Sequence, residues 1–119
     1  MRAGIDVLAG LEGRRWLVVG DMAELGEFAA EAHAELGRYA RERGIERLFA
    51  TGRLAAGAVE TFGAGAQWFP DTAALARAVE AGLDAQVRLL VKGSRMNRLE
   101  RVVDALAQPD KASGATGVH

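Results

Sequence analysis

Three short stretches of the sequence carry side chains that could bind or act on a ligand, and each directly follows an apolar run that resembles a β-strand. They are GDMAELGE with Asp21, Met22 and Glu24, TGR at 51–53, and KGSR with Lys92, Ser94 and Arg95. In an open α/β sheet, ligands bind outside the carboxyl ends of the strands. The sequence therefore predicts a binding edge built from these three loops.

The KGSR stretch has the chemistry of an anion site. Lys92 is one of only two lysines among 15 basic residues, and it stands where a strand should pass into a helix. The free N–H groups and the dipole of a helix start attract negative charge, and a lysine adds a formal charge to them. Arg95 could hold a carboxylate through two hydrogen bonds. A purely structural alternative remains, in which Ser94 caps the helix and Gly93 makes the turn.

The other candidate side chains are less specific. Asp21 follows a buried strand, but a single acid does not make a general acid/base pair, and Glu24 has the alternative of simply facing solvent. His33 lies beside the apolar stripe of a predicted helix, which favours a partly buried, hydrogen-bonded histidine over a ligand. We therefore predict no catalytic residue within this chain.

Several common chemistries lack their residues in this sequence. The chain contains no G-x-x-x-x-G-K-[ST] phosphate-binding loop and no G-x-G-x-x-G dinucleotide motif that opens a helix. It has no cysteine and only two histidines, which argues against a metal centre built from these residues. We expect no metal in this chain and no tight nucleotide binding by it alone.

The elements that must position these loops follow from hydrophobic periodicity. Near-continuous apolar runs predict strands at 15–21, 47–52, 67–69 and 88–93. Spacings of three and four predict helices at about 2–11, 27–43 and 53–62, one capped by Asp71, and one that begins at Ser94. Strands that alternate with helices are typical of βαβ units. We predict an α/β fold, a Rossmann-like three-layer α/β/α sandwich with a mostly parallel sheet.

Bulk composition narrows the class of protein. The 119 residues suit one domain, which we place at 1–107, and the polar end at 108–119 is predicted to be a disordered tail. The net charge is −1 with mixed signs, so neither a nucleic-acid surface nor a membrane surface is indicated. No apolar run suits a membrane span or a signal peptide. We expect a monomer in the cytoplasm.

Four stretches together resemble a known family. LVVGDMAELGE, AHAELGRYA, GIERLFATG and VKGSRMNRLERVVDAL are similar, in order and spacing, to the C-terminal domain of the Mur ligases, over roughly residues 1–106. The likeness is to the branch that adds D-alanyl-D-alanine. It implies a Rossmann-like domain that closes over the ATP site of a central domain and presents the incoming amino compound. The chain then looks like a domain excised from a longer enzyme.

The resemblance also implies the chemistry of the whole enzyme. ATP phosphorylates a carboxylate of a UDP-N-acetylmuramoyl-tripeptide, and the amine of D-alanyl-D-alanine attacks the acyl phosphate. ATP and Mg²⁺ would be bound mainly by the central domain, which is missing here, so neither is expected in the isolated domain. We therefore expect the isolated domain to be inactive and, in the full enzyme, to pack against its own central ATPase domain.

Residue roles come from the same resemblance. Lys92, Ser94 and Arg95 are implied to hold the carboxylate of the dipeptide. The opposite wall is implied to contain Asp21, Met22 and Glu24, with His33 approaching the same cleft.

Two other classes stay open at the level of sequence. A receiver-type signalling module also has an early aspartate and a late lysine, which Asp21 and Lys92 imitate, but it needs a phosphoacceptor aspartate at a middle strand where Thr51 and Gly52 stand. A non-catalytic domain that only packs against a partner would instead expose a large apolar area.

Overall fold

The computed structural model describes residues 2–22 and 26–93, in which helices and strands alternate along the chain. The elements are α1 (Arg2–Ala9), β1 (Arg14–Val19), the 3-10 turn η1 (Gly26–Phe28), α2 (Ala29–Glu42), β2 (Arg47–Thr51), α3 (Ala56–Phe62), β3 (Ala66–Phe69), α4 (Thr72–Gly82) and β4 (Val87–Lys92). All four strands lie where the hydrophobic runs predicted them. The helix predicted from Ser94 and the tail predicted at 108–119 lie outside the described residues.

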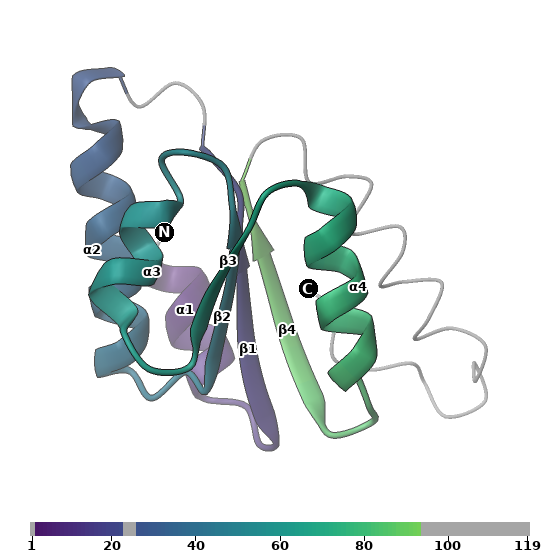
Figure 1. Cartoon of the computed structure of the whole chain (residues 1–119). Helices are drawn as coiled ribbons and strands as arrows, with labels where there is room; N and C mark the ends of the chain where they lie inside the picture. Colours follow the sequence, from purple (N-terminus) through teal and green to yellow (C-terminus); the bar gives the residue numbers. More distant parts are fainter. Residues whose placement is uncertain (1, 23–25, 94–119) are drawn as a thin grey trace.

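The strands form one four-stranded sheet in the order β3-β2-β1-β4, and every pair in it is parallel (Figure 1). In β1 the four residues from Trp16 to Val19 are all buried. A strand needs apolar side chains on both faces when both faces of the sheet are covered, which explains the continuous apolar run. The predicted parallel sheet is confirmed.

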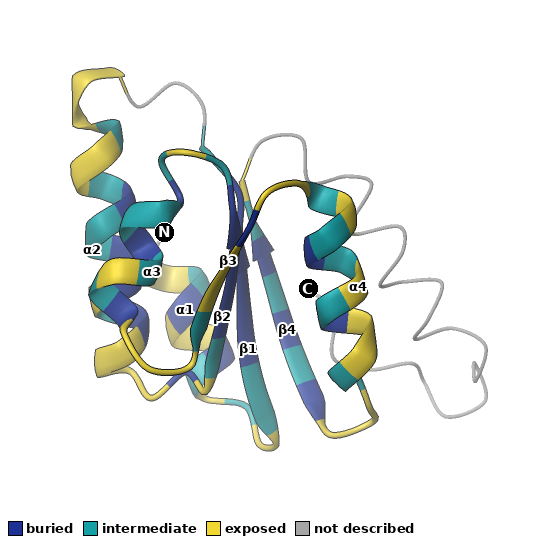
Figure 2. Ribbon diagram, viewed as in Figure 1, coloured by how far each residue is buried: buried dark blue, intermediate teal, exposed yellow. Residues whose placement is uncertain are grey.

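Helices cover both faces of this sheet. On one side α1, α2 and α3 cover a cluster that includes Ile5 of α1, Leu17 and Leu48, and on the other side α4 packs its Leu75 over Trp16 and Phe49. Figure 2 shows buried residues concentrated in the strands and in the sides of the helices that face them, with exposed residues on the outer sides. The described residues therefore form the predicted three-layer α/β/α arrangement.

Local signals account for most element boundaries. The Asp71 carboxylate caps α4 by accepting a hydrogen bond from the Ala74 N–H at 2.8 Å, as the sequence predicted. Two boundaries differ from prediction. The first turn expected for the helix at Glu27 is the 3-10 turn η1, and α3 begins at Ala56 instead of Arg53 because residues 53–55 form a turn.

The contact between α2 and α3 depends on a glycine. A Cβ placed on Gly37 would lie 2.2 Å from the Ala58 carbonyl oxygen and 2.3 Å from the Thr61 Oγ1. The Thr61 hydroxyl donates a hydrogen bond across the same interface to the Ala34 carbonyl, at 2.7 Å. The two helices are therefore in backbone contact at this point, and only glycine fits there.

Among the described residues, no helix has both the length and the apolar character that crossing a membrane would require.

Candidate functional site at the strand ends

The sheet order places a topological switch point at the carboxyl ends of β1 and β4. From β1 the chain builds outward through β2 to β3, and β4 then joins the other side of β1. Connections that leave neighbouring strands in opposite directions open a crevice at their carboxyl ends, where ligands of α/β proteins bind. Two of the three predicted loops, those that begin with Gly20–Asp21 and Lys92–Gly93, leave the sheet at this point.

Each of these two strands is followed directly by a glycine at the switch point. The Gly20 N–H donates to the Lys92 carbonyl at 2.8 Å, which extends the β1–β4 ladder to its last residue. Gly93 has φ +133°, and a Cβ on it would lie 2.7 Å from the Gly20 carbonyl oxygen. The two strand ends therefore approach each other with no side chain between them, and we call Gly20 and Gly93 the glycine notch.

Lys92 lies beside the glycine notch, on the face of the sheet that α1 covers. Its side chain lies against Gly4 in the first turn of α1, where an added Cβ would be 3.1 Å from the Lys92 Cε and 3.3 Å from its Nζ. The sequence had suggested an ammonium placed beside the start of the following helix. That helix start lies outside the described residues, so this expectation stays a prediction. The structure adds a neighbour in α1 that sequence reasoning missed, and the only sequence signal was a glycine inside an amphipathic helix.

Asp21 connects the end of β1 to the turn that follows β2. Its Oδ1 accepts a hydrogen bond from the Ala55 N–H at 2.8 Å. Gly52, at φ +105°, packs so closely on this carboxylate that an added Cβ would lie 2.3 Å from Oδ1. This hydrogen bond joins the loop after β1 to the turn after β2, and it holds the residue that directly precedes α3.

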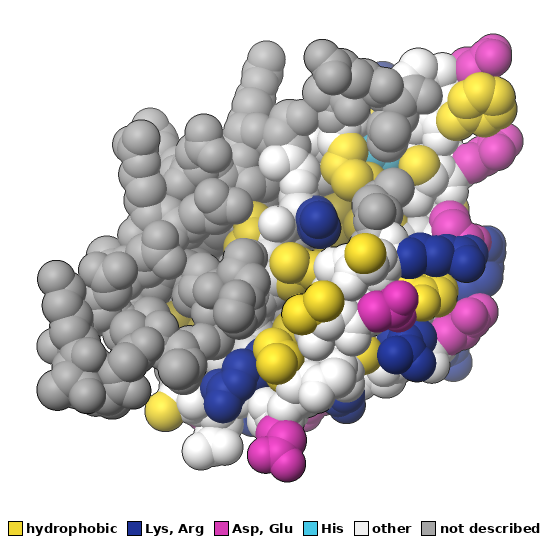
Figure 3. All heavy atoms as spheres, turned by 180° about the vertical axis from the view of Figure 1, so that it is seen from behind, with side chains coloured by type: hydrophobic (Ala, Val, Ile, Leu, Met, Phe, Trp, Pro, Cys, Tyr) yellow, Lys and Arg dark blue, Asp and Glu magenta, His cyan; other side chains and the backbone are white. Residues whose placement is uncertain are grey.

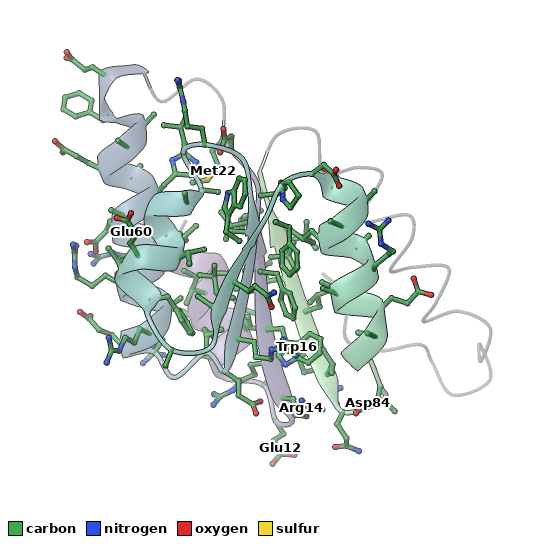
Figure 4. The ribbon with its side chains drawn as sticks, in the orientation of Figure 1. Glu12, Arg14, Trp16, Met22, Glu60 and Asp84 are labelled. Atoms are coloured by element: carbon green, nitrogen blue, oxygen red, sulfur yellow. The ribbon has the colours of Figure 1, made fainter. Side chains whose placement is uncertain are left out.

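Met22 is held by the histidine that the sequence singled out. The Met22 N–H donates to the His33 Nε2 at 3.0 Å, and the His33 Nδ1 lies 2.6 Å from the Ala29 carbonyl oxygen. The His33 side chain is fully buried, so the expected hydrogen-bonded histidine is what the structure shows. Figure 4 shows Met22 at the carboxyl end of the sheet and Trp16 and Arg14 toward the opposite end. Glu24, Ser94 and Arg95 lie outside the described residues.

The end of β3 adds an aromatic residue to this edge. The Trp68 indole N–H donates to the Gly52 carbonyl at 2.9 Å, and 44% of the residue is exposed. The QWF run predicted a strand, but its periodicity gave no sign that the indole lies over the turn after β2. Trp68 is therefore a residue of the strand-end edge that sequence reasoning missed.

Charges away from the edge form small local pairs. The hydrogen bond from Arg2 to Glu35 connects α1 and α2, and Arg38 bonds to the same carboxylate from within α2. The Arg2 bond lowers the pKa of the Glu35 carboxyl below its ordinary value. The hydrogen bond that Tyr39 donates to Asp6 raises the pKa of the tyrosine hydroxyl. Figure 3 shows basic and acidic side chains interspersed on the face that it presents. No described part of that face is an extended basic surface.

The described residues do not supply a metal site. They contain no group of three or more histidine, cysteine, aspartate or glutamate side chains that could hold an ion. Magnesium prefers several oxygen ligands, and Asp21 already bonds to the Ala55 N–H. The described part of the edge offers one ammonium group beside glycine backbone, which suits a small anion or a carboxylate better than a metal–nucleotide pair.

Comparison with known proteins identifies the family. The family model described as "Mur ligase, glutamate ligase domain" matches residues 1–95. That match covers well over half of the chain, and it includes the loops at both strand ends of the glycine notch. The chain belongs to the Mur ligase family, as the resemblance predicted.

Several relatives within that family carry the same name. The chain is 38% identical to the UDP-N-acetylmuramoyl-tripeptide--D-alanyl-D-alanine ligase of Escherichia coli (strain K12), over 91% of this chain and 24% of that ligase. It is 32% identical to the ligase of the same name in Bacillus subtilis (strain 168), over 91% of this chain and 25% of the relative. The chain thus spans about a quarter of the length of these relatives.

Solved structures agree with this fold. MurF from Acinetobacter baumannii superposes with a TM-score of 0.71 at 28% identity, covering 89% of this chain and 25% of that one. The MurF ligase from Thermotoga maritima in complex with ADP superposes with a TM-score of 0.69 at 25% identity, covering 88% and 24%. The receiver-type alternative gains no support, because β2 ends in Thr51, whose hydroxyl donates to the Phe69 carbonyl at 2.8 Å.

Proposed function

We propose that this chain is the C-terminal, substrate-binding domain of an ATP-dependent ligase that joins D-alanyl-D-alanine to a UDP-N-acetylmuramoyl-tripeptide during peptidoglycan synthesis. The observation that carries the proposal is the match to ligases of that name over about nine-tenths of the chain. The sheet supports it, because the predicted ligand loops leave it at the switch point between β1 and β4. In the whole ligase, which we expect in the cytoplasm as a monomer, this domain packs against a central domain.

The reaction joins an amine to a carboxyl carbon. The amine nitrogen of the dipeptide attacks the activated carboxyl carbon of the tripeptide, the activating group leaves, and the nitrogen loses a proton to give the amide. ATP supplies the activation by forming an acyl phosphate. In the proposed enzyme, ATP and Mg²⁺ are bound mainly by the central domain. The task of this domain is to hold and orient the dipeptide.

Lys92 is the described residue best suited to the dipeptide carboxylate. Lys92 is half-buried and directly precedes Gly93 of the glycine notch, so a carboxylate held by its ammonium would lie next to strand ends that carry no side chain at Gly20 and Gly93. Asp21 and Met22 form the opposite side of the notch, and Trp68 extends the edge toward β3. Ser94, Arg95 and Glu24 complete the proposed site from segments next to these residues in the sequence.

The substitution Lys92→Met tests this assignment in a ligase that contains the domain. Loss of one desolvated charge contact should lower kcat/KM for the dipeptide on the order of 100-fold, about 2.7 kcal/mol. The same change in the 119-residue chain should cost less than about 1 kcal/mol of unfolding free energy, because a partly exposed charge contributes little to folding. Lys111→Met, at the only other lysine, is the matched control and should leave both values unchanged.

Two results would contradict the proposal. A variant with lower stability and normal turnover per folded molecule would make Lys92 a structural residue. ATP-dependent ligation by the pure 119-residue chain would show that this domain does more than bind substrate.

A further inference from the structure

The loop after β1 is anchored on both sides by two neighbouring residues. On one side the Asp21 carboxylate accepts the Ala55 N–H, and on the other the Met22 N–H donates to the His33 ring. The His33 ring lies in the apolar layer under α2 and is fully buried. Both bonds fix the backbone at the point where it leaves the sheet, directly after Gly20 of the glycine notch.

The partners of the His33 ring define its protonation pattern. A backbone N–H can only donate, so the Nε2 that faces Met22 must be the bare acceptor nitrogen of the ring. A backbone carbonyl can only accept, so the Nδ1 that faces Ala29 must carry the proton. The ring is therefore neutral, in the Nδ1–H form, and both of its nitrogens are used inside the protein.

We propose that His33 is a positioning residue for the dipeptide: through its Nε2 it holds the Met22 backbone, and with it the wall of the glycine notch opposite Lys92, in the geometry that the substrate needs. This proposal rests on the proposed function. His33 acts on the substrate only through Met22, because its own ring has no exposed surface. A loop held in place before binding costs less ordering entropy when the ligand arrives.

Substituting glutamine or asparagine at position 33 tests the roles of the two ring nitrogens separately. The amide oxygen of His33→Gln can reach the place of Nε2 and accept from Met22, whereas the shorter side chain of His33→Asn reaches only the place of Nδ1. Amide hydrogen exchange of the 119-residue chain, followed by NMR, should show Met22 protected in His33→Gln to within about threefold of the unsubstituted chain. In His33→Asn that protection should fall on the order of 10-fold more than in the core strands.

The second readout is kinetic, in a ligase that contains the domain. His33→Asn should raise KM for D-alanyl-D-alanine on the order of 10-fold with KM for ATP unchanged, and His33→Gln should restore it. A purely structural role predicts a different pattern, in which both variants lose protection equally at all core amides and lose activity only with the folded fraction.

The outcomes distinguish a failure of the positioning role of His33 from a failure of the proposed function. Unchanged Met22 protection in His33→Asn, or an unchanged dipeptide KM, would overturn the positioning role. Absence of dipeptide-dependent ligation by the unsubstituted ligase would overturn the proposed function, while the exchange data would still decide whether His33 holds Met22.

Discussion

The side chain of Lys92, at the end of β4, crosses the first turn of α1 at Gly4, where a single added carbon would lie 3.1 Å from the Lys92 Cε. Leu90 approaches the same point, with its Cδ2 3.3 Å away. A helix that begins the chain and a strand some ninety residues along it therefore define together where the ammonium stands. The missing side chain at Gly4 leaves the room that the Lys92 side chain occupies.

Replacing Gly4 by alanine should move Lys92 without unfolding the domain. The end of a lysine can shift, and alanine favours a helix over glycine by up to about 1 kcal/mol, so the free energy of unfolding should stay within about 1 kcal/mol. In a ligase that contains the domain, kcat/KM for the dipeptide should fall on the order of 10-fold, because the charge is displaced.

Two controls isolate the displacement of Lys92 in this experiment. Gly10→Ala, whose added carbon would meet nothing closer than 3.6 Å, should leave kcat/KM unchanged. In a Lys92→Met background Gly4→Ala should have no further effect on kcat/KM. An equal effect in both backgrounds would mean that Gly4 acts by another route.

At the interface of α2 and α3, alanine should lower the stability of the domain at one glycine and leave it unchanged or higher at another. Gly37→Ala brings its new carbon within 2.2 Å of the Ala58 carbonyl oxygen, which must force the helices apart at a cost of about 2–4 kcal/mol. Gly57→Ala in α3 meets nothing closer than 3.8 Å and should be neutral or stabilising by up to about 1 kcal/mol. Urea unfolding of the two variants checks this, and equal stabilities would refute the close contact.

The Glu35 carboxyl should make stability depend on acid pH. Its folded-state pKa is lowered, chiefly by the hydrogen bond from Arg2, so its contribution is present above the ordinary glutamate pKa and is lost as pH falls through the lowered value. The Tm of the unsubstituted chain should exceed that of Glu35→Gln by a constant amount near neutral pH. This Tm gap should disappear as the pH falls below about 4.5.

Two further measurements test the assignment of this gap to Glu35. Because the pair is exposed, 0.5 M salt should reduce the gap. A gap that widened as pH fell would contradict the pairing.

The Asp71 cap should account for a measurable share of the stability of α4. Asp71→Ala removes the acceptor of the Ala74 N–H and should cost about 1 kcal/mol in urea unfolding. Asp71→Asn keeps an acceptor oxygen and should retain most of that stability. If both variants lost the same amount, charge and not capping would be responsible.

Local pattern was enough to predict the sheet and the loops that leave its carboxyl ends. The runs at Trp16–Val19 and Leu48–Ala50 are buried on both faces, and continuous apolar sequence is the direct sign of that environment. Contacts between distant elements were beyond such reasoning. The packing of Lys92 on Gly4, the bond from Trp68 to Gly52 and the bond from Ala55 to Asp21 all join residues far apart in the sequence, and none of them shows in the hydrophobic periodicity.

The position of β4 in the sheet has a consequence for the order of folding. Among residues 2–22 and 26–93, β4 is hydrogen-bonded only to β1, with Arg14 opposite Val87, whereas β1, β2 and β3 can pair with shorter stretches of chain between them. Closing that long loop carries the larger entropic cost and follows synthesis of the other three strands. A nascent or truncated chain that ends before β4 could hold most of its sheet and still lack Gly93 and Lys92. Competence to receive a ligand at this edge would thus be acquired only when β4 joins the sheet.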